Sequence, residues 1–207
     1  MIQLNDVFFQ YKKNQPVLKG VNYHFEDGSK YVIRGNNGSG KTTLLRLLCG
    51  LLNVTAGSIV YPTNQVIGFL PDNNGIYESM TILENIKFRI SLYKLSYQDL
   101  MNDVQTLLVT YDLKAHKDTL VSNLSLGMKK KVALICTYIV HPDIFILDEP
   151  TGGIDNHSKT ELIAMLNTVK RNPGITIITS HDMDFLESMK AKTILIEDGG
   201  LRDEPTM

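Results

Sequence analysis

Several features are scarce in this 207-residue sequence, and each scarcity excludes a class of protein. There are only two cysteines, Cys49 and Cys136, and both fall in apolar segments with helical spacing. We therefore expect reduced, buried thiols in a cytosolic protein, and neither a disulfide nor a cysteine metal site. We also expect no secretion signal, because a strand-like segment follows Met1 directly.

The sequence also lacks an excess of charge of either sign, since it contains 21 Lys and Arg residues and 22 Asp and Glu residues. Proteins that bind nucleic acid through their charge usually carry a basic excess, so no nucleic-acid partner is expected. The longest mainly apolar run, Val132–Val140, has nine residues, whereas a helix that crosses a bilayer needs about 20. Any role at a membrane would therefore require docking on another chain. Repeats and low-complexity linkers are absent too, which favours one domain.

The N-terminal part of the chain has the alternating pattern of β-strands. Residues 2–11 alternate between apolar and polar side chains, and so do residues 21–25. A Glu-Asp-Gly-Ser turn at residues 26–29 separates this second strand from residues 31–34, which predicts that these two strands form an antiparallel hairpin. The segments expected next are a helix at 42–51 and a short strand pair near 58–60 and 66–70.

The middle of the chain changes to helical spacing, beginning with Ile82, Ile86 and Ile90. A further amphipathic helix at 128–139 stops at Pro142, so a helical insert over about 77–140 is predicted. Short apolar strands then alternate with helices, which predicts a largely parallel sheet covered on both faces. These last segments are strands at 144–148, 175–179 and 193–197, a helix at 157–170 and a short helix from Asp182.

A phosphate-binding pattern, G-x-x-x-x-G-K-[ST], is matched without a mismatch between the strand at 31–34 and the following helix. Its glycines can adopt positive φ and turn backbone N–H groups inward, and the helix N-terminus favours the same anion. Lys41 would reach the β- and γ-phosphates, and the Thr42 hydroxyl would bind Mg²⁺. The candidate ATP-binding residues here are Gly35, Asn36, Asn37, Gly38, Ser39, Gly40, Lys41, Thr42 and Thr43.

This pattern by itself indicates only a nucleoside triphosphate, and the flanking strand and helix argue against a chance glycine-rich turn. A pair of acids, Asp148 and Glu149, follows the apolar strand 144–147 about a hundred residues later. The strand would deliver both acids to the carboxyl edge of the sheet, where ligands of such sheets bind. Asp148 suits a hold on Mg²⁺, and Glu149 suits the general base for an attacking water. The alternative is an acidic pair that caps a helix.

The segment Asn-Leu-Ser-Leu-Gly-Met-Lys-Lys-Lys at residues 123–131 resembles the Leu-Ser-Gly-Gly-Gln element of the ATP-binding cassette (ABC) family, and the likeness covers nearly the whole chain. Ser125 would cap the helix that follows and leave N–H groups facing an anion. In the family that anion is the γ-phosphate held by a second subunit. The resemblance therefore implies that Ser125, Gly127 and Met128 bind ATP in trans.

Four more residues occupy positions that the family uses. The resemblance implies that Tyr11 stacks on adenine, that Asp155 communicates across the dimer and that His181 contacts the γ-phosphate. Asp72 stands where the family has a Gln that touches Mg²⁺ and the attacking water. This substitution adds a negative charge, which should make ATP binding more dependent on the metal. Leu126 and Met128 also depart from the family's Gly and Gln.

The resemblance implies an α/β fold: a P-loop NTPase core with a mainly parallel sheet, an N-terminal antiparallel β subdomain and an inserted α-helical subdomain, all in one ABC ATPase domain over 1–207. It implies ATP hydrolysis with Mg²⁺, a head-to-tail dimer with a second ABC subunit, and a transmembrane permease gripped by a groove around 72–95. The protein would then be cytoplasmic and peripheral on the inner face of the cell membrane. The Leu-Ser-x-Gly-Met-Lys pattern is similar to that of exporters of drugs, peptides or ions.

Three alternatives stay open. A soluble ABC ATPase of translation or DNA repair usually has two cassettes or a long coiled-coil insert, whereas this chain has one phosphate loop and no heptad run. A generic P-loop kinase or GTPase would lack the Ser125 element. The third alternative is a non-catalytic partner cassette of a heterodimer, although the presence of Glu149 and His181 favours an active hydrolase.

Overall fold

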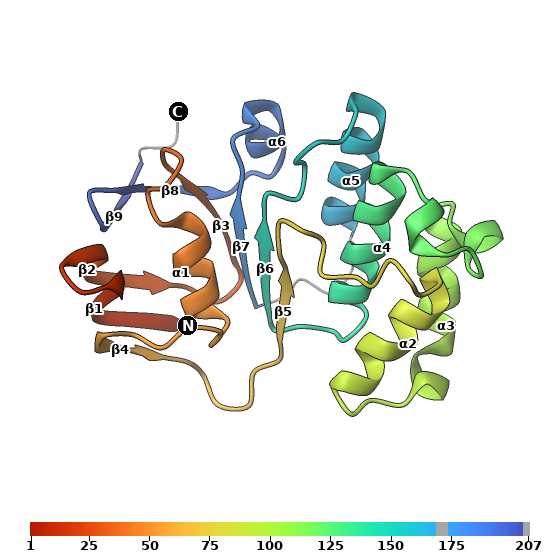
Figure 1. The fold of residues 1–207 in the computed structure, drawn as a ribbon, viewed down its shortest axis with the longest axis horizontal. Coiled ribbons are helices and arrows are strands. Elements are labelled where there is room, and N and C mark those ends of the chain that lie inside the picture. Colours follow the sequence, from red (N-terminus) through yellow and green to blue (C-terminus); the bar gives the residue numbers. More distant parts are fainter. Residues whose placement is uncertain (169–173, 205–207) are drawn as a thin grey trace.

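The computed structural model describes residues 1–168 and 174–204, which form two sheets and a set of helices beside them (Figure 1). The strands are β1 (Ile2–Lys12), β2 (Gln15–Phe25), β3 (Ser29–Arg34), β4 (Ala56–Val60), β5 (Ile67–Leu70), β6 (Ile144–Asp148), β7 (Ile175–Thr179), β8 (Lys192–Glu197) and β9 (Gly200–Asp203). The helices are α1 (Lys41–Leu48), α2 (Ile82–Leu92), α3 (Tyr97–Thr110), α4 (Leu126–Tyr138), α5 (Asn156–Thr168) and α6 (Met183–Ser188), with short 3-10 turns η1 (Lys114–His116) and η2 (Val121–Asn123).

The smaller sheet is antiparallel and has the order β2-β1-β4. The predicted hairpin between the second and third strands is wrong, because β2 pairs with β1 and β3 lies in the other sheet. The chain instead reverses before β2 at Asn14, whose φ is 65°. The burial pattern explains the difference: β1 and β2 bury only some of their side chains, whereas Tyr31, Val32 and Ile33 of β3 are all buried. Such a continuous apolar run is typical of a central parallel strand.

The larger sheet has the order β5-β6-β7-β3-β8-β9, with parallel pairing except between β8 and β9. All five residues of β6 and all five of β7 are buried, as expected for strands covered on both faces. The predicted mainly parallel sheet is thus confirmed. Both strands expected near 58–60 and 66–70 are present, but their predicted pairing is wrong. Strand β4 pairs with β1 and β5 pairs with β6, so they belong to different sheets.

The two faces of the larger sheet belong to two hydrophobic cores. Side chains such as Ile33 and Ile146 point into the core that holds α1 and the smaller sheet. Their neighbours Val32 and Leu147 point into the other core, which holds α2, α4 and α5. Successive residues of a strand point to opposite faces, so α1 and α4 cover opposite sides of the same sheet.

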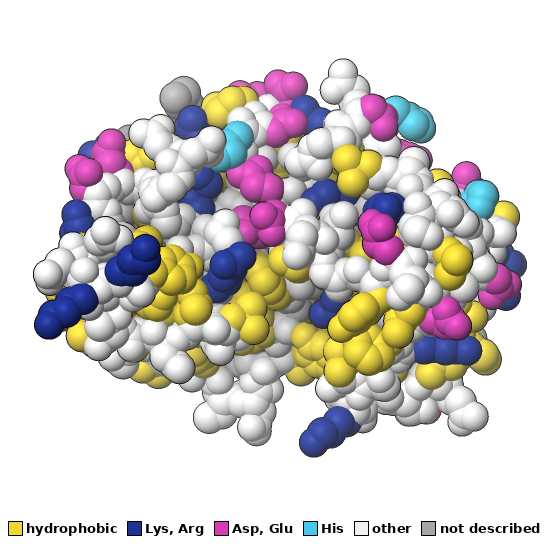
Figure 2. Space-filling model, viewed as in Figure 1, with side chains coloured by type: hydrophobic (Ala, Val, Ile, Leu, Met, Phe, Trp, Pro, Cys, Tyr) yellow, Lys and Arg dark blue, Asp and Glu magenta, His cyan; other side chains and the backbone are white. Residues whose placement is uncertain are grey.

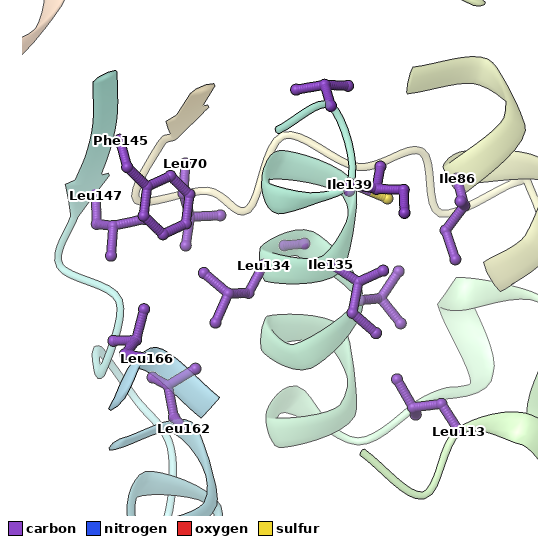
Figure 3. Packing of buried hydrophobic residues seen from close by; sticks show 14 of the residues in the cluster. Leu70, Ile86, Leu113, Leu134, Ile135, Ile139, Phe145, Leu147, Leu162 and Leu166 are labelled. Carbon is purple, nitrogen blue, oxygen red and sulfur yellow. The ribbon is translucent and has the colours of Figure 1, made fainter. Parts of the chain in front are cut away.

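We call residues 71–143, between β5 and β6, the helical lobe. Its helix α4 is buried almost all round and joins the lobe to the sheet (Figure 3). Leu134 points toward β5 and β6, whereas Ile135 and Ile139 point toward Ile86 of α2 and toward Leu113. Within the described part of the chain, no helix is both long and apolar enough to cross a membrane.

Helix boundaries differ slightly from those predicted. Helix α1 ends at Leu48, before the expected residue 51, because Gly50 adopts a φ of 68° and Leu51 N donates to Arg46 O over 2.9 Å. This is the bonding of a Schellman motif. Helix α5 is described to Thr168, so the predicted end at 169–170 lies outside the described residues. Both cysteines are free thiols, and burial raises the pKa of each to about 12.

Candidate active site

Four parallel strands, β3, β5, β6 and β7, end at one edge of the larger sheet, the upper edge in Figure 1. The ends of these strands and the loops that follow contain the phosphate loop, Asp72, the pair Asp148 and Glu149, and His181. Figure 2 shows acidic and basic side chains gathered near the middle of the face turned toward the viewer. A hydrophobic patch lies below them, on the side of the helical lobe. The topology therefore brings the candidate residues of four separate segments to the same edge.

The phosphate loop needs glycine at specific positions. Gly38 and Gly40 have φ values of 81° and 107°, in the left-handed region that other residues avoid. A Cβ atom on Gly35 would lie 2.5 Å from the main-chain oxygen of Ile196 and 2.7 Å from Ser39 Oγ. The loop therefore packs closely against β8, and α1 begins at Lys41 directly after it.

The side chains of this loop are arranged for an anion. Lys41 Nζ donates to the main-chain oxygens of Gly35, at 2.8 Å, and Asn36, at 3.1 Å, and the residue is only 8% exposed. Ser39 Oγ is buried and has no hydrogen-bond partner among the residues described. Buried hydroxyls are usually satisfied, so the orphaned Ser39 hydroxyl beside an ammonium and a helix N-terminus fits a phosphate oxygen.

Two threonines follow at the start of α1. Thr42 is half-buried, whereas Thr43 is buried and its Oγ1 lies 3.2 Å from the Tyr11 hydroxyl. Tyr11 packs edge-on against Phe9, with ring centroids 4.8 Å apart, yet 57% of the residue is exposed. The structure thus places an exposed aromatic ring beside the start of α1, directly after the phosphate loop.

The acidic pair differs in environment. Asp148 is 1% exposed, and its Oδ1 accepts a hydrogen bond of 2.6 Å from Thr179 Oγ1. Its Oδ2 is buried and lacks a hydrogen-bond partner in the described part of the chain. A buried carboxylate oxygen without a partner suits a cation such as Mg²⁺. The contact of Thr179 with Asp148 could not be predicted from the sequence, because it depends on β7 being the neighbour of β6.

Glu149 has a left-handed backbone, with φ of 46°. Its N–H is held by both oxygens of Thr179, each at 3.1 Å. Its side chain meets His181: Glu149 Oε1 lies 3.3 Å from His181 Nε2, and the His181 amide donates to Oε2 over 3.3 Å. The glutamate side chain is 26% exposed and the histidine side chain 51%. The two candidate catalytic residues therefore lie in contact, at the solvent side of Asp148.

A buried lysine that we did not single out from the sequence also reaches this site. Lys130 of α4 is 3% exposed, and its Nζ donates to the main-chain oxygens of Asp72, at 3.2 Å, and Glu149, at 3.4 Å. Burial lowers the pKa of Lys130, and the negative charges of Asp72, Asp148 and Glu149 oppose that shift. The carboxylate of Asp72 is exposed and accepts from the Asn73 amide over 2.9 Å.

Ser125 caps α4 as expected, since its Oγ accepts from the amide of Met128 over 3.2 Å. The first turn of α4 is tightly packed: a Cβ atom on Gly127 would lie 2.2 Å from Ser158 Oγ of α5. Leu126, which replaces a glycine of the family element, is 44% exposed. The N-terminus of α4 is thus accessible, and it lies on the face of the sheet away from α1.

Asp155 precedes α5 and caps it. Its two carboxylate oxygens accept from the amide and the hydroxyl of Ser158, each over 2.9 Å. These hydrogen bonds, the amide's first, hold the pKa of Asp155 below its ordinary value. Ser158 therefore connects the Asp155 loop to the close contact at Gly127, so two elements that the sequence suggested separately lie side by side.

A groove of about 510 Å³ lies between α1, β5 and α2. It is lined largely by apolar and aromatic side chains, among them Leu51, Phe69, Tyr77, Phe88, Leu92 and Tyr93. One wall is shaped by Asn85, which is 3% exposed. Its Oδ1 accepts from the Tyr77 amide over 2.7 Å, and its Nδ2 donates to the main-chain oxygens of Tyr77 and Thr81 over 3.0 and 2.9 Å.

Comparison with known proteins places this arrangement in a family. The model of the ABC transporter family matches residues 18–152. An ABC transporter ATP-binding protein of Treponema denticola is 27% identical over 99% of this chain and 43% of its own length. One of Pyrococcus horikoshii is 27% identical over 98% of this chain and 82% of its own length. The chain thus spans less than half of the first relative and about four fifths of the second.

Solved structures agree with this fold. The dimeric ATP-binding cassette MJ0796, in a post-hydrolysis state with ADP and phosphate, matches with a TM-score of 0.85 at 24% identity, over 99% of this chain and 98% of that one. Clostridium perfringens cbiO1, part of the ABC transporter complex cbiONQ, matches with a TM-score of 0.80 at 25% identity, over 97% of this chain and 86% of that one. Since the family model covers well over half of the chain, the protein belongs to the ABC transporter family, as an ATP-binding cassette.

Proposed function

We propose that this chain hydrolyses ATP as one half of a head-to-tail pair of cassettes and thereby drives a separate permease. One observation carries the proposal: the two proposed phosphate-binding elements lead into helices on opposite faces of one sheet. The phosphate loop leads into α1 on one face, whereas Ser125 begins α4 on the other. A single chain would then be unable to place both elements around one triphosphate. A second copy, turned head to tail, supplies the missing element.

In this proposal the phosphate loop holds the triphosphate from one side. The inward N–H groups of residues 35–42 and the Ser39 hydroxyl bind its oxygens, and Lys41 exchanges its bonds to Gly35 and Asn36 for bonds to phosphate. Tyr11 offers its exposed ring to the adenine. From the other subunit, Ser125, Gly127 and Met128 present a helix N-terminus to the γ-phosphate.

Glu149 is the proposed general base, and its position supports that role. The backbone anchor on Thr179 and the contact with His181 hold its carboxylate at the solvent side of the buried Asp148. A base must lie within hydrogen-bond reach of the water it activates. His181, half exposed beside it, would meet the γ-phosphate and keep Glu149 oriented.

The proposed magnesium ligands are Thr42, Asp148 and Asp72. The buried Oδ2 of Asp148 fits this ion, since a carboxylate oxygen is a preferred ligand and this one has no partner among the residues described. Bound Mg²⁺ would neutralise charge on the phosphate oxygens. Thr179 holds the other oxygen of Asp148 and so fixes the orientation of the carboxylate.

The groove between α1, β5 and α2 is the proposed site for the permease. The groove is concave, largely apolar and bordered by the Asp72 loop. A cytoplasmic helix of the permease bound there would be displaced when the Asp72 loop moves in response to ATP. The relative cbiO1 belongs to a transporter complex, which supports a membrane partner here. We propose a place at the inner face of the cell membrane. Export of a drug, peptide or ion rests on the similarity of residues 124–129 to exporter cassettes.

The test is an ATPase assay combined with a measurement of mass in solution. Wild-type protein should hydrolyse ATP with Mg²⁺, and Glu149→Gln should hydrolyse far less while forming a stable dimer with ATP by light scattering. Glu187→Gln, at an exposed glutamate of α6, is the matched control and should behave as wild type. Wild-type turnover in the Glu149→Gln variant would refute the catalytic role. A wild-type chain without turnover would favour a non-catalytic partner cassette.

A further inference from the structure

Lys130 is a buried charged residue to which the proposed mechanism assigns no role. It lies on α4 and is 3% exposed, and its Nζ donates to two main-chain oxygens, those of Asp72 at 3.2 Å and Glu149 at 3.4 Å. Burying an ammonium group is unfavourable unless acceptors take its protons. The two carbonyl groups therefore hold the side chain in place, and the side chain in turn holds them.

The two carbonyl groups belong to different segments of the site. Asp72 follows β5 and starts the helical lobe, whereas Glu149 follows β6 in the core. These strands are parallel neighbours in which Leu70 is opposite Leu147, so their following loops begin side by side. Lys130 thus joins α4 to both loops at the point where they leave the sheet.

The bond to Glu149 falls on the turn that sets the backbone of the proposed base. Glu149 O also accepts from the Gly152 amide over 3.0 Å, and Glu149 itself has the left-handed φ of 46°. Left-handed backbone in a residue other than glycine persists where its surroundings impose it. Lys130 is one of the groups that impose it here, together with Thr179.

The charge of Lys130 is matched to its surroundings. The negative charges of Asp72, Asp148 and Glu149 favour the charged form of Lys130 and oppose the lowering of its pKa by burial. Without Lys130, the carboxylates of Asp72, Asp148 and Glu149 would lack this nearby positive charge. The positive charge therefore offsets the extra carboxylate that Asp72 contributes in place of the family's neutral Gln.

We propose that Lys130 is a positioning residue that ties the Asp72 loop of the helical lobe to the Glu149 turn of the core. The kinetic part of this inference rests on the proposed function, because it assumes that Glu149 acts on ATP. The structural part concerns the chain alone. A displacement of the Asp72 loop would therefore displace the main chain of Glu149 through Lys130.

The structural part is tested on the protein without nucleotide by hydrogen–deuterium exchange. Lys130→Met keeps the length of the side chain but removes both bonds. The amides of Asn74, bonded to Pro71 O, and Gly152, bonded to Glu149 O, report on the two loops. We expect both to exchange about tenfold faster in Lys130→Met, as when one hydrogen bond stops holding a segment closed.

The matched control is Lys131→Met, one position along α4. Lys131 is also buried, but its Nζ pairs with Glu161 of α5 at 2.7 Å, away from the two loops. Its removal should leave the amides of Asn74 and Gly152 unchanged. Equal exchange at both amides in wild type and Lys130→Met would overturn the inference. If Lys130→Met does not fold, Lys130→Gln, which is shorter and uncharged, replaces it in both experiments.

The kinetic part is tested by steady-state ATP hydrolysis. Lys130→Met should lower kcat about tenfold or more and change KM less than about threefold, because the base is displaced while the phosphate loop is intact. Adding Asp72→Gln should restore part of kcat, since it removes the carboxylate left without its counter-charge. A kcat equal to that of Lys131→Met, or no recovery in the double variant, would contradict the inference. Wild type without turnover would contradict the proposed function instead, and the exchange experiment would still decide on Lys130.

Discussion

The contact between Gly127 and Ser158 leads to a quantitative prediction. A Cβ atom at position 127 would lie 2.2 Å from Ser158 Oγ and 2.8 Å from Ser158 Cβ, both closer than side-chain carbons approach. Relieving such overpacking costs about 1–3 kcal/mol. Alanine also gains about 1 kcal/mol over glycine inside a helix. Gly127→Ala should therefore lower the free energy of unfolding by up to about 2 kcal/mol, although an isolated helix would gain stability.

Urea denaturation of single and double variants measures this effect. Ser158→Ala removes the nearest atom, so Gly127→Ala should cost about 1 kcal/mol less in that background than in wild type. Gly200→Ala is the control, since its Cβ would meet no atom closer than 3.7 Å, and a change within about 0.5 kcal/mol is expected there. If Gly127→Ala costs as much in the Ser158→Ala background as in wild type, the reasoning about close packing of α4 on α5 fails.

Three further predictions concern the active site and the groove. Asp72→Gln should keep ATPase activity, with a weaker dependence of ATP binding on Mg²⁺ in a titration; an inactive variant would refute the equivalence of Asp72 with the family's Gln. Thr179→Val should cost about 1–3 kcal/mol in urea denaturation, because Asp148 Oδ1 loses its buried partner; unchanged stability would contradict this. Asn85→Leu should cost a similar amount, about 1–3 kcal/mol, and speed amide exchange at Tyr77, whereas protected exchange would show that Asn85 does not order the groove.

Much of the fold could be predicted because the parallel strands are short, apolar and separated by helices with clear periodicity. Strand partners could not be predicted in the same way. The turn before β3 looked like a hairpin turn, but pairing depended on burial: β3 is buried throughout and joins the parallel sheet, whereas β2 is only partly buried and pairs with β1. Local turn residues do not carry this information.

The sequence predicts those parts of the candidate site whose function requires particular residue types close together in the chain, such as the glycines of the phosphate loop. Thr179 and Lys130 were missed because their roles exist only after folding. Thr179 reaches Asp148 because β7 happens to be the neighbour of β6. Lys130 is one of three successive lysines, and the sequence does not tell which of them is buried against the site. The roles assigned to Tyr11, Asp155 and His181 stay predictions.

The most direct test is a crystal structure of Glu149→Gln with ATP and Mg²⁺. We expect two chains related head to tail, with Ser125 Oγ and the Gly127 amide of one chain within hydrogen-bonding distance of the γ-phosphate held by Lys41 of the other. A single chain that encloses its own triphosphate, with Ser125 far from any nucleotide, would contradict it.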